Sequence, residues 1–170
     1  MFRRYQSPRS GLLSGGLGGI LAIVFALAVP GIALAAEGAY APQKVVYHVN
    51  FYGADHQTAA LRNVQNQIDA VGKDNIEVQV VMHGDGLSLL LPADEVAGTK
   101  MKEGNADDEM QARIAGLKQQ GVKLKICANT LKGRQVDLAA LYDADEADVV
   151  PSGVAELSKL QGEGFSYIKP

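Results

Sequence analysis

The only cysteine of the chain, Cys127, lies in the stretch GVKLKICANTLKGR (121–134), where an apolar run gives way to turn-forming residues. A lone thiol cannot close a disulfide within its own chain, so it is buried, reactive or joined to another molecule. Backbone N–H groups at the turn, together with Lys132 and Arg134, favour a reactive thiolate. Free cysteine also packs in many cores as a small apolar side chain, and this alternative stays open.

The three histidines fall at the same predicted edge as the cysteine. His48 lies near the end of the first predicted strand, His56 begins the helix that follows, and His83 ends the second strand. Ligands of open parallel sheets bind beyond the carboxyl ends of the strands, which is where these side chains are expected. Imidazole transfers protons near neutral pH, and imidazole and thiolate together bind zinc or copper. Both kinds of chemistry are therefore open.

The turn after the second strand reads His83-Gly84-Asp85-Gly86. It lacks the Lys-Ser/Thr pair of a P-loop and the spacing of a dinucleotide fingerprint, although Gly84 stays a candidate ligand-binding position. The chain has no His-x-x-x-His pair, no Gly-x-Ser-x-Gly elbow and no Cys-x-x-Cys motif. Zinc-protease, α/β-hydrolase and dithiol redox chemistry are thus unsupported, and no cofactor is expected.

Strand and helix patterns alternate through the elements that must position these residues. Leu61, Val64, Ile68 and Val71 share one helical stripe, and Gly72 ends it. Residues 87–107 are expected to hold a short helix and a mobile loop. The alternation predicts βαβ units, that is, an α/β fold with a mainly parallel sheet and helices on both faces. Predicted strands are 44–50, 76–83, 122–128, 147–151 and 165–170; predicted helices are 56–71, 108–121, 136–143 and 153–164.

The N-terminal residues have the pattern of a secretory signal peptide. Arg3, Arg4 and Arg9 precede the apolar run GLGGILAIVFALAVPGIALA, which closes on an Ala-x-Ala site. We expect residues 1–36 to be the signal peptide, 37–170 the domain, and the mature protein to be periplasmic or secreted. An uncleaved anchor is the alternative, but interrupting glycines and Pro30 leave fewer than the ~20 apolar residues a span needs. The flank FRRYQSP matches a twin-arginine signal poorly.

The charge of the expected mature chain excludes some partners. Loss of the three signal arginines lowers Lys plus Arg from 16 to about 13 against 19 Asp plus Glu, a formal charge of about −6. Nucleic acid and anionic membrane both require clustered positive charge, so neither is expected as a partner. The remaining ~134 residues are enough for one domain with one core.

The chain resembles the DsrE/DsrF-like family of sulfur-relay and intracellular sulfur-oxidation proteins. Three stretches together carry the resemblance: VVMHGDGLSLLL, GVKLKICANTL and VVPSGVAELSKLQGEGFSYIKP. The resemblance implies a three-layer α/β/α domain with a five-stranded parallel sheet in the order 4-3-2-1-5. It also implies homo- or hetero-oligomers. In sulfur-carrying members the cysteine that ends the third strand accepts sulfur as a persulfide, and that role maps onto Cys127.

The favoured hypothesis is an exported sulfur carrier that holds sulfane sulfur on Cys127 and exchanges it with a sulfur donor or acceptor protein. His83 would accept or donate a proton, and Asn129 and Arg134 would bind an anionic sulfur species. Two alternatives remain: a non-catalytic oligomeric interaction module with a packed cysteine, and a metal- or small-ligand-binding module. The residues for the metal or small ligand would be His48, His83 and Cys127.

Overall fold

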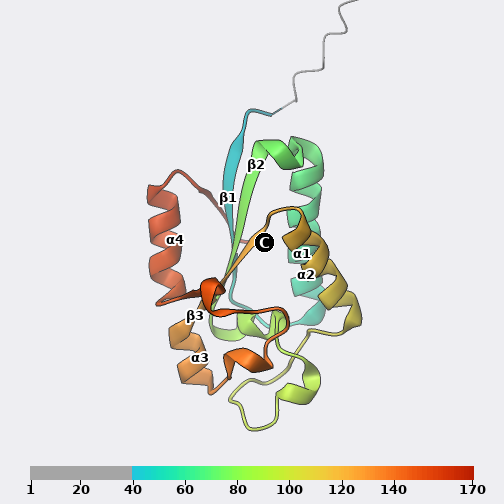
Figure 1. The fold of residues 1–170 in the computed structure, drawn as a ribbon, viewed down its shortest axis with the longest axis vertical. Helices are drawn as coiled ribbons and strands as arrows, with labels where there is room; N and C mark the ends of the chain where they lie inside the picture. Colours follow the sequence, from blue (N-terminus) through green and yellow to red (C-terminus); the bar gives the residue numbers. More distant parts are fainter. Residues whose placement is uncertain (1–39) are drawn as a thin grey trace, which may run out of the picture. The chain divides into compact units, whose positions relative to one another are not determined.

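The computed structural model describes residues 40–170 (Figure 1). The signal peptide expected at residues 1–36 lies outside them, as does the start of the arm that follows it. Within the described part of the chain, no helix is both long and apolar enough to span a bilayer.

Five strands form one sheet in the order β4-β3-β2-β1-β5, and every neighbouring pair is parallel. This confirms the predicted fold class and the strand order implied by the family resemblance. Parallel neighbours require crossover connections, and the helices between the strands supply them. The strands are β1 (Gln43–Val49), β2 (Ile76–Met82), β3 (Lys123–Cys127), β4 (Val149–Val150) and β5 (Ser166–Ile168).

Helices cover both faces of the sheet, as Figure 1 shows. Helices α1 (Ala54–Val71) and α2 (Asp108–Gln119) lie against one face, and α4 (Gly153–Gly162) lies against the other. A short helix, α3 (Ala128–Arg134), continues directly from the end of β3. The domain therefore has the three layers expected.

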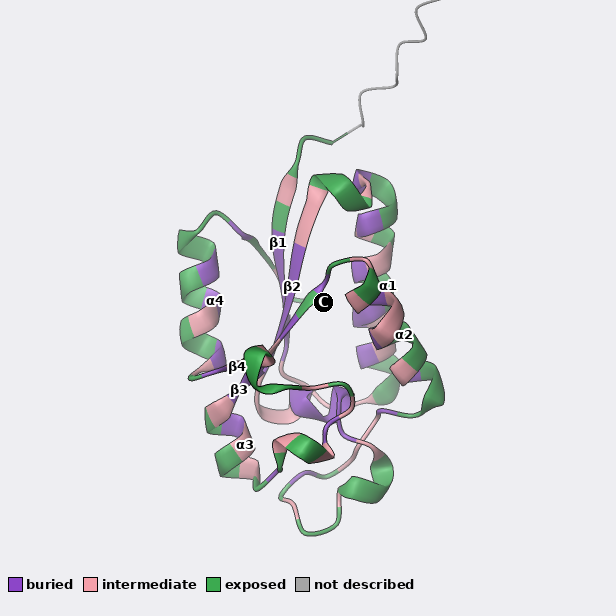
Figure 2. Cartoon of the chain, viewed as in Figure 1, coloured by how far each residue is buried: buried purple, intermediate pink, exposed green. Residues whose placement is uncertain are grey.

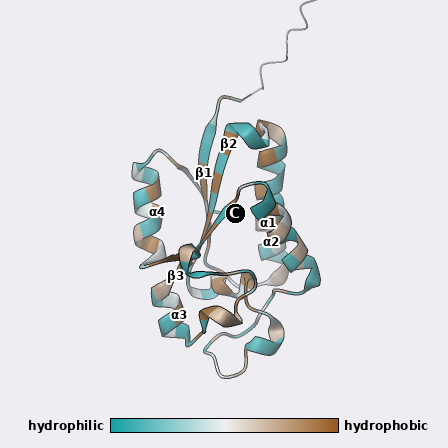
Figure 3. Cartoon of the chain, viewed as in Figure 1, coloured by the Kyte–Doolittle hydropathy of each residue, from teal (hydrophilic) through white to brown (hydrophobic). Residues whose placement is uncertain are grey.

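The two faces differ in how much apolar surface they bury. Alternate strand residues such as Val45, Val80 and Ile126 point into the larger cluster under α1 and α2. The α4 side holds a smaller cluster of Val46, Val81, Leu157, Leu160 and Phe165. Figure 2 shows the buried residues along the strands and on the inner sides of the helices, and Figure 3 shows hydrophobic colour in the same central strands. The α4 face, which buries the smaller apolar cluster, is the face that carries the polar side chains of His48 and Tyr167.

Local signals account for most helix boundaries. The carboxylate of Asp107 accepts a hydrogen bond from the backbone N–H of Met110 at 2.8 Å and so caps α2, while Ser152 caps α4. Gly72 ends α1 with φ of 90°, a conformation that favours glycine. These ends lie within about two residues of the predicted ones.

Two segments differ from the predictions. The helix predicted for 136–143 is only a 3₁₀ turn at Leu138–Ala140, whereas the preceding segment, which looked like a turn, forms α3. Asn129 and Gly133 are poor helix formers, but the contacts of α3 with β3 and with the 3₁₀ helix Gly84–Leu89 override their low helix propensity. Residues 87–91, at the start of the segment expected to hold a short helix and a mobile loop, are fully buried, and the 3₁₀ helix Gly84–Leu89 ends within them.

Candidate functional site

Cys127 is the last residue of β3 and the residue that precedes α3. Its side chain is buried, with 5% of the residue exposed. Burial by itself raises the pKa of the thiol. Hydrogen bonds to the sulfur from the Thr130 hydroxyl and from the backbone N–H groups of Gly153, Thr130 and Asn129 outweigh it, so the pKa of Cys127 lies below its ordinary value. The site thus favours a thiolate without exposing it.

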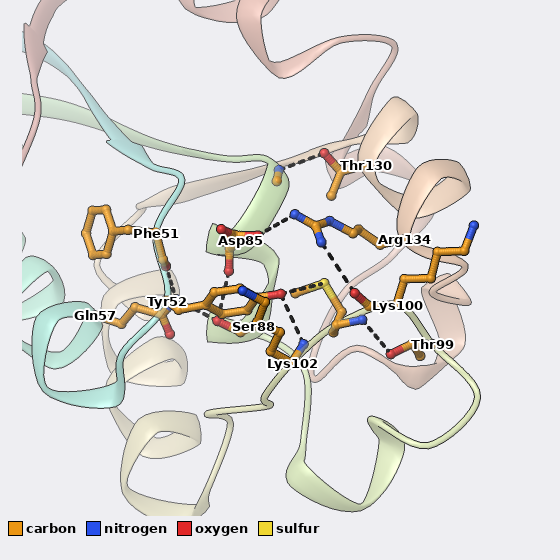
Figure 4. A network of polar contacts seen from close by, with 12 residues as sticks. Phe51, Tyr52, Gln57, Asp85, Ser88, Thr99, Lys100, Lys102, Thr130 and Arg134 are labelled. Atoms are coloured by element: carbon orange, nitrogen blue, oxygen red, sulfur yellow. Dashed lines mark hydrogen bonds and ion pairs between the residues drawn. The ribbon is translucent and has the colours of Figure 1, made fainter.

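Thr130 joins the sulfur to the turn after β2. Its hydroxyl donates to Cys127 and accepts a hydrogen bond from the backbone N–H of Gly84 at 2.8 Å. Figure 4 shows this contact between α3 and the turn. Gly84 has φ of 55°, the left-handed conformation that points its N–H toward Thr130 at low cost. The hydroxyl is therefore oriented by a fixed backbone donor.

Gly153, at the start of α4, closes the site from the other side. A Cβ atom at this position would lie 3.0 Å from His83 Cβ, 3.2 Å from His83 Cδ2 and 3.3 Å from Cys127 Cβ. The side chains of His83 and Cys127 therefore flank the same point, and the lack of a Cβ at Gly153 leaves room for both beside its backbone. The register explains the meeting, because His83 and Cys127 directly follow the paired residues Met82 and Ile126.

His48 and His83 contact each other through their ring nitrogens. The two Nε2 atoms are 2.7 Å apart, and the rings stack with centroids 4.7 Å apart. His48 Nδ1 lies 2.6 Å from the hydroxyl of Tyr167 on β5. His48 and Tyr167 share the α4 face, because Tyr167 pairs with Val46, two residues before His48. Three strands thus contribute one line of polar side chains.

Both histidines are held neutral. Burial, followed by the nearby Lys169 charge and by His83, lowers the pKa of His48 to about 4. Burial, followed by Lys169, also lowers the pKa of His83. The Lys169 ammonium lies 4.9 Å from the centre of the Phe51 ring and bonds to Asn50. At neutral pH the histidine pair therefore carries no charge, since protonation would place a cation beside Lys169.

The other predicted site residues are less directly placed at the sulfur. Arg134 pairs with Asp85 and donates to the backbone carbonyl of Lys100 at 3.3 Å, so its charge is already compensated (Figure 4). The Asn129 side chain is exposed, and its contribution at the sulfur is its backbone N–H. His56 stacks edge-on against Phe51 and lines a separate pocket of about 270 Å³.

A buried polar cluster holds the segment that carries Gly84. The Gln57 side chain, fully buried, donates to the Phe51 carbonyl at 2.7 Å and to Ser88 Oγ at 2.8 Å. Asn105 donates to Gln57 Oε1 at 2.9 Å. Figure 4 shows Asp85 and Ser88 of this turn between Gln57 on one side and Thr130 and Arg134 on the other. The turn is therefore fixed from both α1 and α3.

Four residues of the site were not predicted from the sequence: Thr130, Gly153, Tyr167 and Lys169. The sequence did contain a signal for Tyr167. The strand order implied by the family resemblance puts β5 beside β1, and the alternation of side chains along the strands puts Tyr167 on the same face as His48. Thr130 lies one helical turn after Cys127, but the segment was not expected to be helical. Nothing in the sequence indicates the approach of Gly153. Among residues 40–170, no three His, Cys, Asp or Glu side chains are grouped as a metal site.

The fold and site define a parallel α/β/α domain with a lone, activated cysteine at the end of its third strand. The model of the DsrE/DsrF-like family matches residues 44–170, and the chain belongs to this family. No curated protein matches it.

Two solved structures support the fold. One is the protein of unknown function MTH1491 from Methanobacterium thermoautotrophicum, which is 26% identical and has a TM-score of 0.60. The other is the ychN protein from E. coli, which is 22% identical and has a TM-score of 0.54. Each match covers 75% of this chain and 99% of the other.

Proposed function

We propose that the protein is a periplasmic sulfur carrier that accepts sulfane sulfur as a persulfide on Cys127. Family membership supports a sulfur-relay-related role. The observation that carries the proposal is the set of donors around the sulfur: the Thr130 hydroxyl and three backbone N–H groups. Donors that stabilise a thiolate lower the pKa of the cysteine and raise the fraction present as the nucleophilic thiolate, which the first step of sulfur transfer needs.

The proposed loading step is a displacement at sulfur. The Cys127 thiolate attacks the terminal sulfur of a hydropersulfide donor, R–S–SH, so that a new S–S bond forms as the donor S–S bond breaks. The products are Cys127–S–SH and R–S⁻, and the leaving thiolate keeps the electron pair of the broken bond. Unloading is the same reaction toward an acceptor thiolate, with Cys127–S⁻ as the leaving group.

A single cysteine suits a carrier. A second thiol in the same chain would attack the persulfide, release sulfide and close a disulfide. The sequence has one cysteine, so no other thiol in this chain can attack the persulfide and release its sulfur.

Mass spectrometry of the mature protein tests the proposal. Incubation with polysulfide is expected to add the mass of one or more sulfur atoms, removed again by reduction, and Cys127→Ser is expected to gain none. A thiol that resists polysulfide and alkylation until the protein is unfolded would refute the carrier function and favour the interaction module. Copper or zinc that copurifies with the protein and blocks the thiol would favour the metal-binding module.

Export and oligomerisation belong to the same proposal. The basic, apolar and Ala-x-Ala pattern of residues 1–36 supports export and cleavage, and N-terminal sequencing of the exported protein should begin near Ala36 or Glu37. Retention of Arg3 on a membrane-bound form would contradict it. The family resemblance supports a homo-oligomer, and light scattering that gave a monomer mass at micromolar concentration would count against one.

A further inference from the structure

Tyr167, His48 and His83 form a line of polar contacts from the surface to a ring that lies beside Cys127. The Tyr167 hydroxyl lies 2.6 Å from His48 Nδ1, and His48 Nε2 lies 2.7 Å from His83 Nε2. Tyr167 is 43% exposed, whereas His48 is 9% exposed. At the inner end, His83 and Cys127 flank the same point beside Gly153. Side chains from β5, β1 and the end of β2 thus lead from solvent to the ring that neighbours Cys127.

The short contacts require ordered protons. Two Nε2 atoms at hydrogen-bond distance share one proton, so one ring donates and the other accepts. When His48 donates from Nε2, its Nδ1 accepts the Tyr167 O–H. When His48 accepts at Nε2, its Nδ1–H donates to the Tyr167 oxygen, which then donates outward. The three side chains therefore have two complete hydrogen-bond arrangements. Each proton moves to the neighbouring acceptor between one arrangement and the other, as a proton-conducting chain requires.

We propose that Tyr167, His48 and His83 are a proton relay between the sulfur carried by Cys127 and solvent. The inference rests on the persulfide function proposed above and assigns Tyr167 and His48 a part in it. His83 is the member nearest Cys127, because its Cβ and Cδ2 and the Cβ of Cys127 lie around the same point beside Gly153. Its Nδ1 is the ring nitrogen that the contact with His48 leaves free. His48 and Tyr167 act through His83 and touch no reacting atom.

Sulfur transfer needs such a route because the persulfide changes its proton during the cycle. Loading from R–S–SH gives Cys127–S–SH, and loss of a proton through the relay leaves Cys127–S–S⁻. An anionic terminal sulfur repels an incoming thiolate, so unloading needs the proton back. The acceptor R′–S⁻ then takes the terminal sulfur of Cys127–S–SH to give R′–S–SH and Cys127–S⁻. Neither exchange needs an oxidant or a reductant. Over one cycle the persulfide loses one proton through the relay and takes one back.

The charges around the histidine pair keep it in the state that a relay needs. Cys127 lies on the β3 side of the pair, and Tyr167 and Lys169 lie on the β5 side. Burial and the Lys169 cation lower the pKa of both rings, so neither stores the proton as a stable imidazolium. A neutral pair can take up and pass on one proton, whereas a pair protonated on both rings would lose the Nε2 contact because neither Nε2 could accept.

The test uses the mature protein loaded with sulfur, with unloading to an excess of a small thiol followed across pH. Tyr167→Phe removes the outer hydroxyl and is expected to slow unloading by at least about tenfold in dilute buffer, as loss of a general acid–base path does. Small proton carriers such as imidazole should restore the rate. The extent of loading and the titration of the Cys127 thiol should stay unchanged. His48→Gln interrupts the relay at its centre and should show the same rescue.

Tyr142→Phe is the matched control, because Tyr142 is partly buried and lies outside the line of contacts. It should unload at the wild-type rate. If Tyr167→Phe keeps the wild-type rate, pH profile and buffer independence while Cys127→Ser still abolishes loading, the relay is refuted and the carrier function stands. If the wild-type protein takes up no sulfur, the carrier function fails and the relay with it.

Discussion

Replacement of Thr130 by valine tests the reasoning about the activated thiol most directly. The Thr130 hydroxyl donates to the Cys127 sulfur and is itself held by the Gly84 N–H at 2.8 Å. Valine has nearly the same shape and no hydroxyl, so the change removes these two hydrogen bonds and little packing. Thr130 is 8% exposed, and water therefore has poor access to replace the lost donor.

The expected size follows from the value of a hydrogen bond to a charged group. Such a bond contributes about 1.5–3 kcal/mol. One pKa unit corresponds to about 1.4 kcal/mol, so loss of the bond to the thiolate should raise the pKa of Cys127 by about one to two units. The Gly84 N–H also loses its partner, which should destabilise the fold by about 1–3 kcal/mol.

The assay is the rate of alkylation of the native protein as a function of pH, since only the thiolate reacts. Thr130→Val should shift the midpoint of the rate to higher pH and slow persulfide loading at neutral pH. Thr130→Ser keeps the hydroxyl and is the matched control, expected to titrate close to the wild type. An unchanged midpoint in Thr130→Val, with the fold intact by circular dichroism, would show that the hydroxyl does not tune the thiol.

Two further predictions concern packing and pH. Gly153→Val places a Cβ 3.0 Å from His83 Cβ and should destabilise the protein by about 1–3 kcal/mol in denaturant unfolding, while Gly162→Ala, in open space on the same helix, should not; equal effects would contradict the proposed close approach. The folded pKa of His48, about 4, lies below its unfolded value of about 6.5, so the unfolded state binds more protons between them and stability falls as pH drops through this window. The loss should be at most about 3 kcal/mol. His48→Gln should flatten it, and an equally steep loss in that variant would assign the acid sensitivity to other groups.

Much of the fold could be predicted from the sequence, because local patterns determine it. The stripe of Leu61, Val64 and Ile68 and the cap before α2 are signals within one element, and the corresponding helices are present. The segment after Cys127 was harder. Its Asn129 and Gly133 favour turns, and only contacts made by the folded domain reveal the helix there.

The site shows the same division between local and distant signals. The positions of His48, His83 and Cys127 at strand ends follow from the chain alone. The contact between the two imidazoles depends on sheet register, as does the contact with Tyr167, 119 residues from His48. The pairing of Arg134 with Asp85 spans 49 residues and replaces the free cation that composition suggests. Charge and residue type identify candidates, but only register and packing decide which of them meet.

The donors around the sulfur of Cys127 come from two different helices. Asn129 and Thr130 belong to α3, which continues directly from β3, whereas Gly153 belongs to α4, which covers the sheet face opposite α1 and α2. The acidity of the thiol therefore measures the position of α4 relative to β3. A protein that binds the outer surface of α4, where Val154 is 64% exposed, and draws this helix away would withdraw one donor and make the cysteine less nucleophilic. Titration of the thiol would then detect such binding without any probe attached to either partner.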